Sequence, residues 1–164
     1  LAHTGTAAVW EFGAGSGAYA LAAARAVGDD GKVYAIDVRQ ENLSRLKKEA
    51  EGARLHNIEV LRGDLEKLGG SGLRDGAVDA VIVSNILFQI GNKKTFLEEV
   101  KRVLRPGGRV LLIDWTESFG GVGPHIDAVV KEDAAKNLFL DGGFGYEKNI
   151  DAGAYHYGMV FKKM

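Results

Sequence analysis

A run of glycines between an apolar segment and an alanine-rich segment constrains the fold of this 164-residue chain more than any other feature. Residues 8–12 are apolar except for Glu11, residues 13–17 read GAGSG, and residues 18–27 read AYALAAARAV. Glycines allow a tight turn and close approach of the backbone to a ligand, and the first N–H groups of a helix favour an anionic group. The segment predicts a strand, a ligand-binding loop and a helix, although a turn that needs glycine only for packing would look the same.

Similar units follow along the chain, and their order predicts the fold. Strands are predicted at residues 8–12, 32–37, 58–62, 78–83, 109–115, 146–150 and 156–162. Helices are predicted at residues 18–27, from near 40 to 50, 96–104 and 126–140. The short link between the last two strands makes them antiparallel. We therefore expect an α/β fold: a Rossmann-like, doubly wound, mostly parallel seven-stranded sheet with an antiparallel C-terminal hairpin and helices on both faces.

The composition is that of one folded domain, predicted to span residues 1–164, with 46% apolar and 26% charged residues. Lys and Arg number 21 against 22 Asp and Glu, so no broad positive field favours nucleic acid. The absence of cysteine excludes disulfides and thiolate ligands and fits a cytoplasmic location. No apolar run reaches the ~20 residues that span a bilayer. Because the first strand follows Leu1 almost at once, a chain that lacks an N-terminal cap is also expected.

Three acidic residues lie where parallel strands place ligands, at or near their carboxyl ends. Asp37 follows the loop by about 20 residues, a spacing that suits both hydroxyls of a ribose, although it suits a helix N-cap as well. Asp64 ends the third strand and either meets an adenine amino group or is a solvated turn residue. Glu11, inside an apolar strand, needs a partner such as an ammonium group. The loop and the three acids together match the carboxylate, amine, ribose and adenine of S-adenosylmethionine.

Several segments resemble the motifs of class I methyltransferases. The resemblance is carried by VWEFGAGSG at residues 9–17, VYAID at 33–37, GDL at 63–65 and RVLRPGG at 102–108. In detail the chain is similar to the branch with ubiquinone-pathway and other small-molecule methyltransferases, through LIDW at 112–115, GP at 123–124 and YHYG at 155–158. The resemblance covers essentially the whole chain, and that branch has helices before the first strand that help to cover the acceptor.

The resemblance implies a methyltransferase that binds S-adenosylmethionine, transfers its methyl group by in-line displacement to a small-molecule acceptor, and releases S-adenosylhomocysteine. The implied cofactor site consists of Glu11, Gly13, Ala14, Gly15, Gly17, Asp37, Val38, Gly63, Asp64, Leu65, Ser84 and Asn85. Asp114 and Trp115, at the end of the fifth strand, are expected beside Ser84 and Asn85 in the lining of the space next to the methyl group. The sequence specifies neither the acceptor nor the oligomeric state.

No dedicated catalytic residue is required, because the cofactor is already activated. If a base is needed, His125 and His156 are the candidates, since both lie at predicted loops on the carboxyl edge of the sheet. Neither histidine has a metal-ligand spacing, so no metal is expected. Three alternatives stay open: a domain that binds S-adenosylmethionine without turnover, an NAD-dependent oxidoreductase, because Gly13, Gly15 and Ala18 also satisfy its glycine motif, and a methyltransferase acting on RNA.

Overall fold

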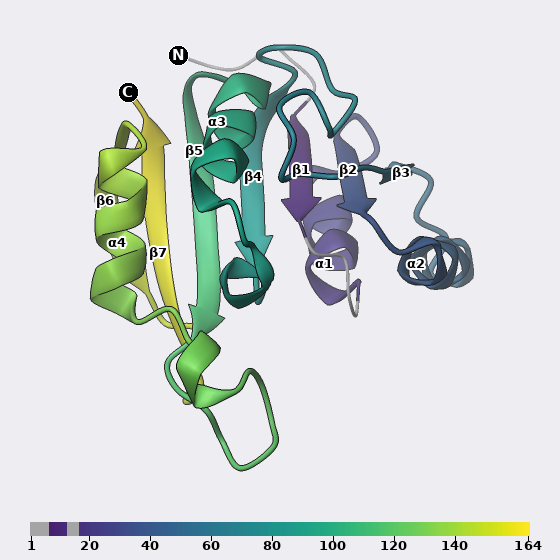
Figure 1. Cartoon of the computed structure of the whole chain (residues 1–164). Helices are drawn as coiled ribbons and strands as arrows, with labels where there is room; N and C mark the ends of the chain where they lie inside the picture. Colours follow the sequence, from purple (N-terminus) through teal and green to yellow (C-terminus); the bar gives the residue numbers. More distant parts are fainter. Residues whose placement is uncertain (1–6, 13–16) are drawn as a thin grey trace.

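A computed structural model describes residues 7–12 and 17–164 of the chain as a seven-stranded sheet with helices on both faces (Figure 1). The strands are β1 Ala8–Phe12, β2 Lys32–Asp37, β3 Ile58–Arg62, β4 Val78–Ser84, β5 Leu104–Trp115, β6 Phe144–Ile150 and β7 His156–Lys163. The α-helices are α1 Ala18–Val27, α2 Gln40–Gly52, α3 Lys93–Val103 and α4 Glu132–Asp141, and the 3-10 helices are η1 Leu87–Gln89 and η2 Ile126–Ala128.

The strand order is β3-β2-β1-β4-β5-β7-β6, which confirms the predicted doubly wound sheet. Strands β1 to β5 pair in parallel, and β7 lies antiparallel between β5 and β6. The order reverses at β1, where β2 and β4 are the two neighbours. In Figure 1 the arrowheads of β1, β2, β4 and β5 all point to the lower edge, so the loops that follow them gather there. In sheets of this kind, ligands bind at that edge beside the reversal point.

The core forms two layers because successive strand residues face opposite sides of the sheet. Trp10 and Phe12 face α3, and the Phe12 ring meets the ring of Phe96 edge-on at 4.8 Å. Val9 faces the other side and packs with Ala20 of α1 and with α2. Trp10 is fully buried in this core. The strand residue between Trp10 and Phe12, Glu11, is thereby placed on the α1 side.

Several predicted boundaries are wrong, among them those of the helix at 126–140 and of the strand at 146–150. Residues 126–140 do not form one helix: η2 ends at Ala128, extended backbone follows, and α4 begins at Glu132. The extended segment is held by the Tyr157 hydroxyl, which donates to the Val130 carbonyl at 2.9 Å. β6 begins two residues early, at Phe144. These starts and breaks are set by contacts with β7, which a local pattern does not contain.

β5 also begins earlier than predicted, at Leu104 and not at residue 109. Val78 pairs with Leu104 and Ala80 with Arg109, so residues 105–108 bulge out of the β4–β5 ladder. The bulge contains the PGG sequence at residues 106–108. Proline and glycine are tolerated at such positions because the bulge does not require every N–H for pairing.

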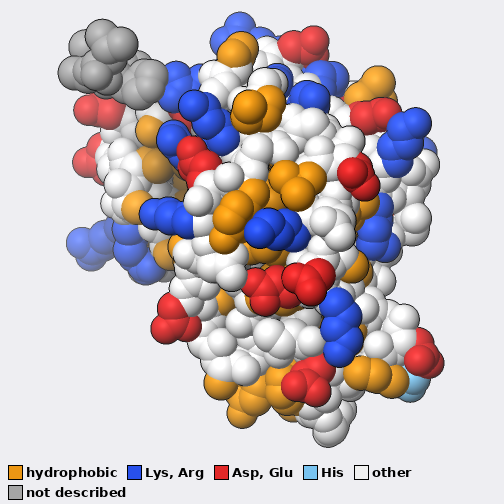
Figure 2. All heavy atoms as spheres, turned by 90° about the vertical axis from the view of Figure 1, so that its left-hand side faces the viewer, with side chains coloured by type: hydrophobic (Ala, Val, Ile, Leu, Met, Phe, Trp, Pro, Cys, Tyr) orange, Lys and Arg blue, Asp and Glu red, His pale blue; other side chains and the backbone are white. Residues whose placement is uncertain are grey.

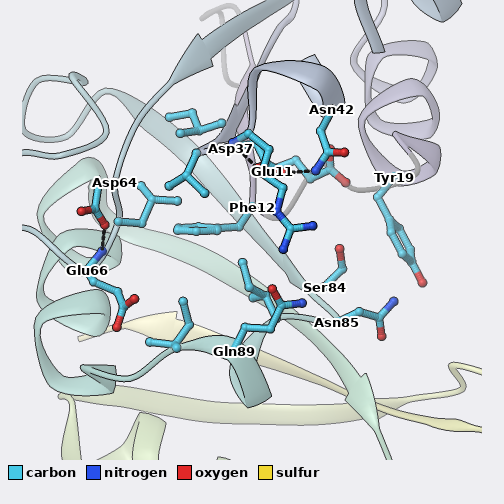
Figure 3. Close-up of a pocket in the computed structure, with 16 residues that line it drawn as sticks. Glu11, Phe12, Tyr19, Asp37, Asn42, Asp64, Glu66, Ser84, Asn85 and Gln89 are labelled. Carbon is cyan, nitrogen blue, oxygen red and sulfur yellow. Dashed lines mark hydrogen bonds between the residues drawn. The ribbon is translucent and has the colours of Figure 1, made fainter. Parts of the chain in front are cut away.

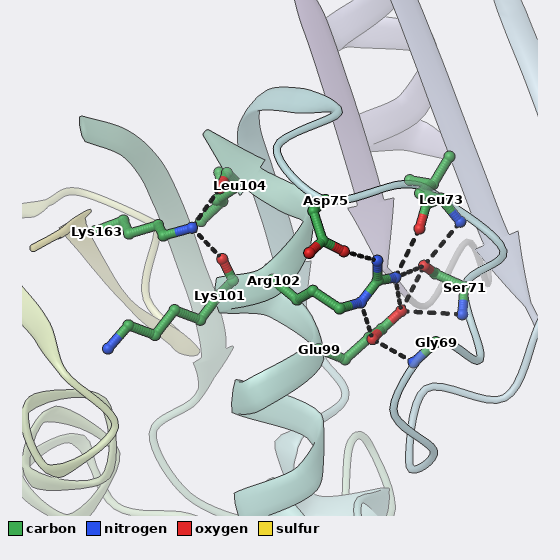
Figure 4. A network of polar contacts seen from close by, with 9 residues as sticks. All are labelled: Gly69, Ser71, Leu73, Asp75, Glu99, Lys101, Arg102, Leu104 and Lys163. Atoms are coloured by element: carbon green, nitrogen blue, oxygen red, sulfur yellow. Dashed lines mark hydrogen bonds and ion pairs between the residues drawn. The ribbon is translucent and has the colours of Figure 1, made fainter. Parts of the chain in front are cut away.

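The long connection from β3 to β4 is fixed to α3 by one buried carboxylate, Glu99 (Figure 4). Its oxygens accept hydrogen bonds from the backbone N–H groups of Gly69 at 2.6 Å and Ser71 at 3.2 Å, and from the Arg102 guanidinium at 2.8 and 2.9 Å. Arg102 also pairs with Asp75. The network fixes the connection whose first residues reach the carboxyl edge.

The surface carries mixed charge. Figure 2, which shows the side of the molecule near α4 and β6, has basic and acidic side chains interspersed, with hydrophobic side chains gathered toward the lower end. Val122, Ile126 and Tyr155 are exposed apolar residues of the loops at the lower edge of the sheet. Among the described residues, no helix has the length and hydropathy needed to cross a bilayer.

Candidate functional site

A cavity of about 380 Å³ opens at the carboxyl edge, where β1, β2 and β4 end (Figure 3). Its lining comes from strand ends, the first turns of α1 and α2, and the segments after β3 and β4. The predicted cofactor residues that line it are Glu11, Asp37, Val38, Asp64, Leu65, Ser84 and Asn85. Residues far apart in the sequence thus meet in one cavity, as the parallel topology requires.

Glu11 is the most unusual residue of the site. β1 places it between Ala35 of β2 and Ile82 of β4, and its side chain is 1% exposed. Its Oε2 has no hydrogen-bond partner among the described residues. The pKa of the carboxyl is raised to about 7, mainly by burial; a hydrogen bond with the Ala20 backbone lowers this pKa, and the charge of Asp37 raises it. A buried, partly uncompensated carboxylate of this kind is suited to a cationic ligand group.

Asp37 presents its carboxylate from the end of β2. Oδ1 accepts the Arg39 backbone N–H at 2.8 Å, and Oδ2 accepts Nδ2 of Asn42 at 2.9 Å. The N-cap residue of α2 is Arg39, so the alternative that Asp37 is itself the N-cap is wrong. Since a carboxylate oxygen can accept more than one hydrogen bond, each oxygen keeps capacity for a further donor. A fixed carboxylate with two accepting oxygens fits a pair of neighbouring hydroxyls.

Asp64 is both a turn residue and a lining residue of the cavity. It lines the cavity, and it also stabilises its own turn, because Oδ1 accepts the Glu66 backbone N–H at 3.1 Å. Oδ2 lies 3.2 Å from the Lys67 ammonium, in a part of the side chain that is open to solvent. Glu66 lies beside it, with Oε1 accepting the Asn92 backbone N–H at 2.6 Å. This end of the cavity is therefore polar, anionic and tied to the start of α3.

The turn after β4 closes the cavity on the opposite side. The Asn85 backbone N–H donates to the Ile113 carbonyl at 2.9 Å. Asp114, 1% exposed, accepts the N–H groups of Ile86 at 3.2 Å and Leu87 at 2.9 Å through one oxygen, and that of Trp115 at 2.8 Å through the other. Neither Asp114 nor Trp115 is among the lining residues, so their expected place in the lining is wrong. Asp114 instead supports the turn from behind.

Two predicted glycines have packing roles in the described structure and are not lining residues. Gly17 has φ 74°, and a Cβ there would lie 2.7 Å from Cδ1 of Leu46. A Cβ on Gly63 would lie 2.5 Å from the Gly70 carbonyl oxygen. The predictions for Gly13, Ala14 and Gly15 fall outside the described residues.

Neither candidate histidine reaches the cavity lining. His125 is an exposed residue at the start of η2, 3.3 Å from a carboxylate oxygen of Asp127. His156 is the first residue of β7, and its ring packs on Trp115 with 4.3 Å between centroids. No group of three or more His, Asp or Glu residues in the described ranges has an arrangement that could hold a metal ion.

Sequence reasoning missed several residues that line the cavity. Tyr19 comes from the first turn of α1 and Asn42 from the first turn of α2, while Glu66 and Gln89 follow the ends of β3 and β4. A usable signal exists for the first pair, because the first turn of each helix that follows a ligand-binding strand starts at the same edge. Nothing in the local sequence distinguishes Glu66 or Gln89 from ordinary surface residues.

Comparison with known proteins identifies the family of this cavity-bearing domain. A family model described as a methyltransferase domain matches residues 10–112, more than half of the chain. The chain belongs to the class I S-adenosylmethionine-dependent methyltransferases. The matched region of this methyltransferase domain runs from β1 into β5 and therefore contains every strand end that borders the cavity. Membership favours the predicted family over the NAD-dependent oxidoreductase considered as an alternative.

Relatives of this methyltransferase domain support the same family. It is 30% identical over 103 residues to a demethylmenaquinone methyltransferase of Bacillus mycoides, covering 63% of this chain and 42% of that protein. It is 31% identical over 106 residues to an arsenite methyltransferase of Halobacterium salinarum, covering 65% and 26%. The chain thus spans less than half the length of these curated relatives. The crystal structure of an S-adenosylmethionine-dependent methyltransferase from Aquifex aeolicus superposes with a TM-score of 0.87 at 29% identity, covering 96% of this chain and 82% of that one.

Proposed function

We propose that this domain binds S-adenosylmethionine in the cavity at the carboxyl edge and transfers its methyl group to a small-molecule acceptor. The observation that carries the proposal is that two different carboxylates, Glu11 of β1 and Asp37 of the neighbouring β2, line the same cavity. One is a buried carboxylate with an unpartnered oxygen, and the other is a fixed carboxylate with capacity for two more donors. The family's cofactor carries an ammonium group and a ribose in one molecule, so it offers a partner to each carboxylate.

The remaining lining residues fit the other parts of this ligand. We assign the ligand ammonium to Glu11, the ribose hydroxyls to Asp37, and the adenine to the space between Val38, Leu65 and Asp64. Val38 is half exposed and offers an apolar side chain at the rim, which an adenine ring would cover. The ligand carboxylate is assigned to residues 13–17, which precede α1 in the sequence, because the first N–H groups of a helix favour an anion.

Held by Glu11 and Asp37, S-adenosylmethionine would supply an electrophilic methyl group, and S-adenosylhomocysteine would be the product that keeps the bonding electron pair on sulfur. The acceptor atom forms the new bond to the methyl carbon and loses its proton. The protein's task is to align the acceptor and to exclude water. That neither His125 nor His156 lines the cavity supports catalysis by alignment, without a histidine base.

The proposed acceptor class is a small molecule. The two relatives named above are called methyltransferases of demethylmenaquinone and of arsenite, both small molecules. The balanced charge of the chain also gives little attraction for nucleic acid. We further propose that residues 1–164 form one domain that works in the cytoplasm, which the absence of cysteine supports.

Thermal unfolding with added ligands tests the cofactor proposal. At about 100 times its dissociation constant, a ligand stabilises the folded state by about 2.7 kcal/mol. We expect S-adenosylhomocysteine and S-adenosylmethionine to raise the melting temperature and NADH to leave it unchanged. Asp37→Ala should abolish the rise, whereas Asp79→Ala, at the opposite end of β4, should keep it. A rise with NADH alone, or no rise with either S-adenosyl ligand, would contradict the proposal.

A further inference from the structure

Arg39 is the only basic residue among the described residues that line the cavity. Four acidic residues, labelled in Figure 3, line the same cavity: Glu11, Asp37, Asp64 and Glu66. The Arg39 guanidinium nevertheless makes no hydrogen bond or ion pair within the described part of the chain. The cavity thus contains one cation that no acidic side chain of the described structure engages.

Arg39 is also an unfavourable residue for the helix position that it occupies. It is the N-cap of α2, with φ −93° and ψ 114°, and its side chain forms no capping hydrogen bond. Serine, threonine, asparagine and aspartate are preferred at an N-cap because their side chains accept a hydrogen bond from a free helix N–H. A cation at this end of a helix also opposes the helix dipole. Local structure therefore does not account for an arginine at position 39.

The position of Arg39 brings its charge near the reacting part of the ligand. Its backbone N–H donates to Oδ1 of Asp37 at 2.8 Å, so its side chain starts beside the carboxylate that we assign to the ribose. In S-adenosylmethionine a single methylene group separates this ribose from the sulfonium sulfur. S-adenosylmethionine carries a net positive charge, whereas S-adenosylhomocysteine lacks the sulfonium and is neutral overall. The two ligands therefore differ in the property to which a nearby cation responds.

We propose that Arg39 sets the preference of the cavity between cofactor and product by repelling the sulfonium charge. This inference rests on the proposed function, because it assigns a specificity role within the same site. The lining acids attract the cationic cofactor more than the neutral product, and Arg39 offsets part of this attraction. On methyl transfer the sulfur regains the bonding electron pair and loses its charge, so the repulsion by Arg39 is relieved. Arg39 thus destabilises the bound cofactor more than the transition state, which favours transfer.

Isothermal titration calorimetry with S-adenosylmethionine and S-adenosylhomocysteine tests this role without a known acceptor. Both ligands share the adenosine and the amino-acid part, so the ratio of their dissociation constants isolates the effect of the sulfonium charge. Arg39→Gln removes the charge of the side chain and keeps a long polar group, whereas Arg39→Lys keeps the charge and changes the shape. Arg45→Gln is the matched control, because it removes the same charge from an exposed position of α2 outside the cavity lining.

At about 0.1 M salt, we expect Arg39→Gln to shift this ratio about threefold to tenfold toward S-adenosylmethionine, as the loss of one like charge in a solvent-exposed cavity predicts. Arg39→Lys and Arg45→Gln should leave the ratio unchanged, and added salt should shrink the shift because it screens the charges. An equal change for both ligands in Arg39→Gln would place Arg39 against their shared part and overturn the inference. An unchanged ratio, or the same shift in Arg39→Lys, would overturn it as well. If wild-type protein binds neither ligand, the proposed function itself fails.

Discussion

Replacing Glu11 with glutamine tests how the cavity is prepared for a cationic group. In the folded protein, burial raises the pKa of Glu11 from 4.5 to about 7. A difference of this size corresponds to about 3 kcal/mol between the two protonation states. Because the folded pKa is the higher one, stability is fully present below pH 4.5 and decreases as the pH rises toward 7. Above pH 7 the free energy of unfolding of the wild type is lower by about 3 kcal/mol than it would be if Glu11 did not ionise.

Glutamine has nearly the same shape and no charge, so Glu11→Gln should lack this loss. We expect the variant to match the wild type near pH 4 and to be more stable at pH 8, by up to about 3 kcal/mol. Urea unfolding at a series of pH values measures the difference, which cancels the contribution of other titrating groups. Glu59→Gln is the control, because it removes a surface carboxylate of β3 that pairs with Lys32 of β2; it should not raise the free energy of unfolding at pH 8.

The same carboxyl should make cofactor binding depend on pH. A ligand ammonium is matched by ionised Glu11, so the wild-type affinity for S-adenosylhomocysteine should fall about tenfold for each pH unit below 7. Glu11→Gln should bind more weakly at pH 8 and show little pH dependence. Calorimetry at several pH values tests this. A variant that is less stable than the wild type at pH 8, or a wild-type affinity that stays constant from pH 5.5 to 8.5, would refute the reasoning.

Two further predictions concern buried carboxylates that act through the backbone. Asp114→Asn keeps one accepting oxygen in place of two, so we expect it to cost about 1–3 kcal/mol and to weaken S-adenosylhomocysteine about tenfold in calorimetry. Asp79→Asn is the control, because Asp79 accepts the backbone N–H of Ala8 at the far end of β4, and it should change stability alone. Equal affinity of the two variants for S-adenosylhomocysteine would show that the turn after β4 does not shape the cavity. Glu99→Gln breaks a buried ion pair with Arg102 and should lower the free energy of unfolding by about 3 kcal/mol in urea. Burial raises the pKa of Glu99, but hydrogen bonds from Arg102, Ser71 and the Gly69 backbone together outweigh it and hold this pKa at about 2. The wild-type advantage should therefore be present above pH 4.5 and shrink as the pH falls toward 2; an advantage that stays constant down to pH 2 would contradict this.

The sequence alone determined the order of the elements, the parallel sheet with its antiparallel end, and the edge at which the proposed site lies. These follow from local periodicity and from short connections, which a chain carries in its own order. The same reasoning placed Glu11, Asp37 and Asp64 at one edge, and the structure brings all three into the cavity lining. Their roles toward a cofactor stay predictions.

Only the tertiary structure decided how these residues behave. The pKa of Glu11, the packing role of Gly17 against Leu46 and the left-handed turn at Asn85 all depend on neighbours from other elements. Asp114 looked like a lining residue because it ends a strand beside the site, yet its carboxylate is bound to N–H groups 27 and 28 residues away. Local patterns predict which residues reach an edge, whereas the direction and ionisation of a side chain are fixed by contacts between segments that are distant in the sequence.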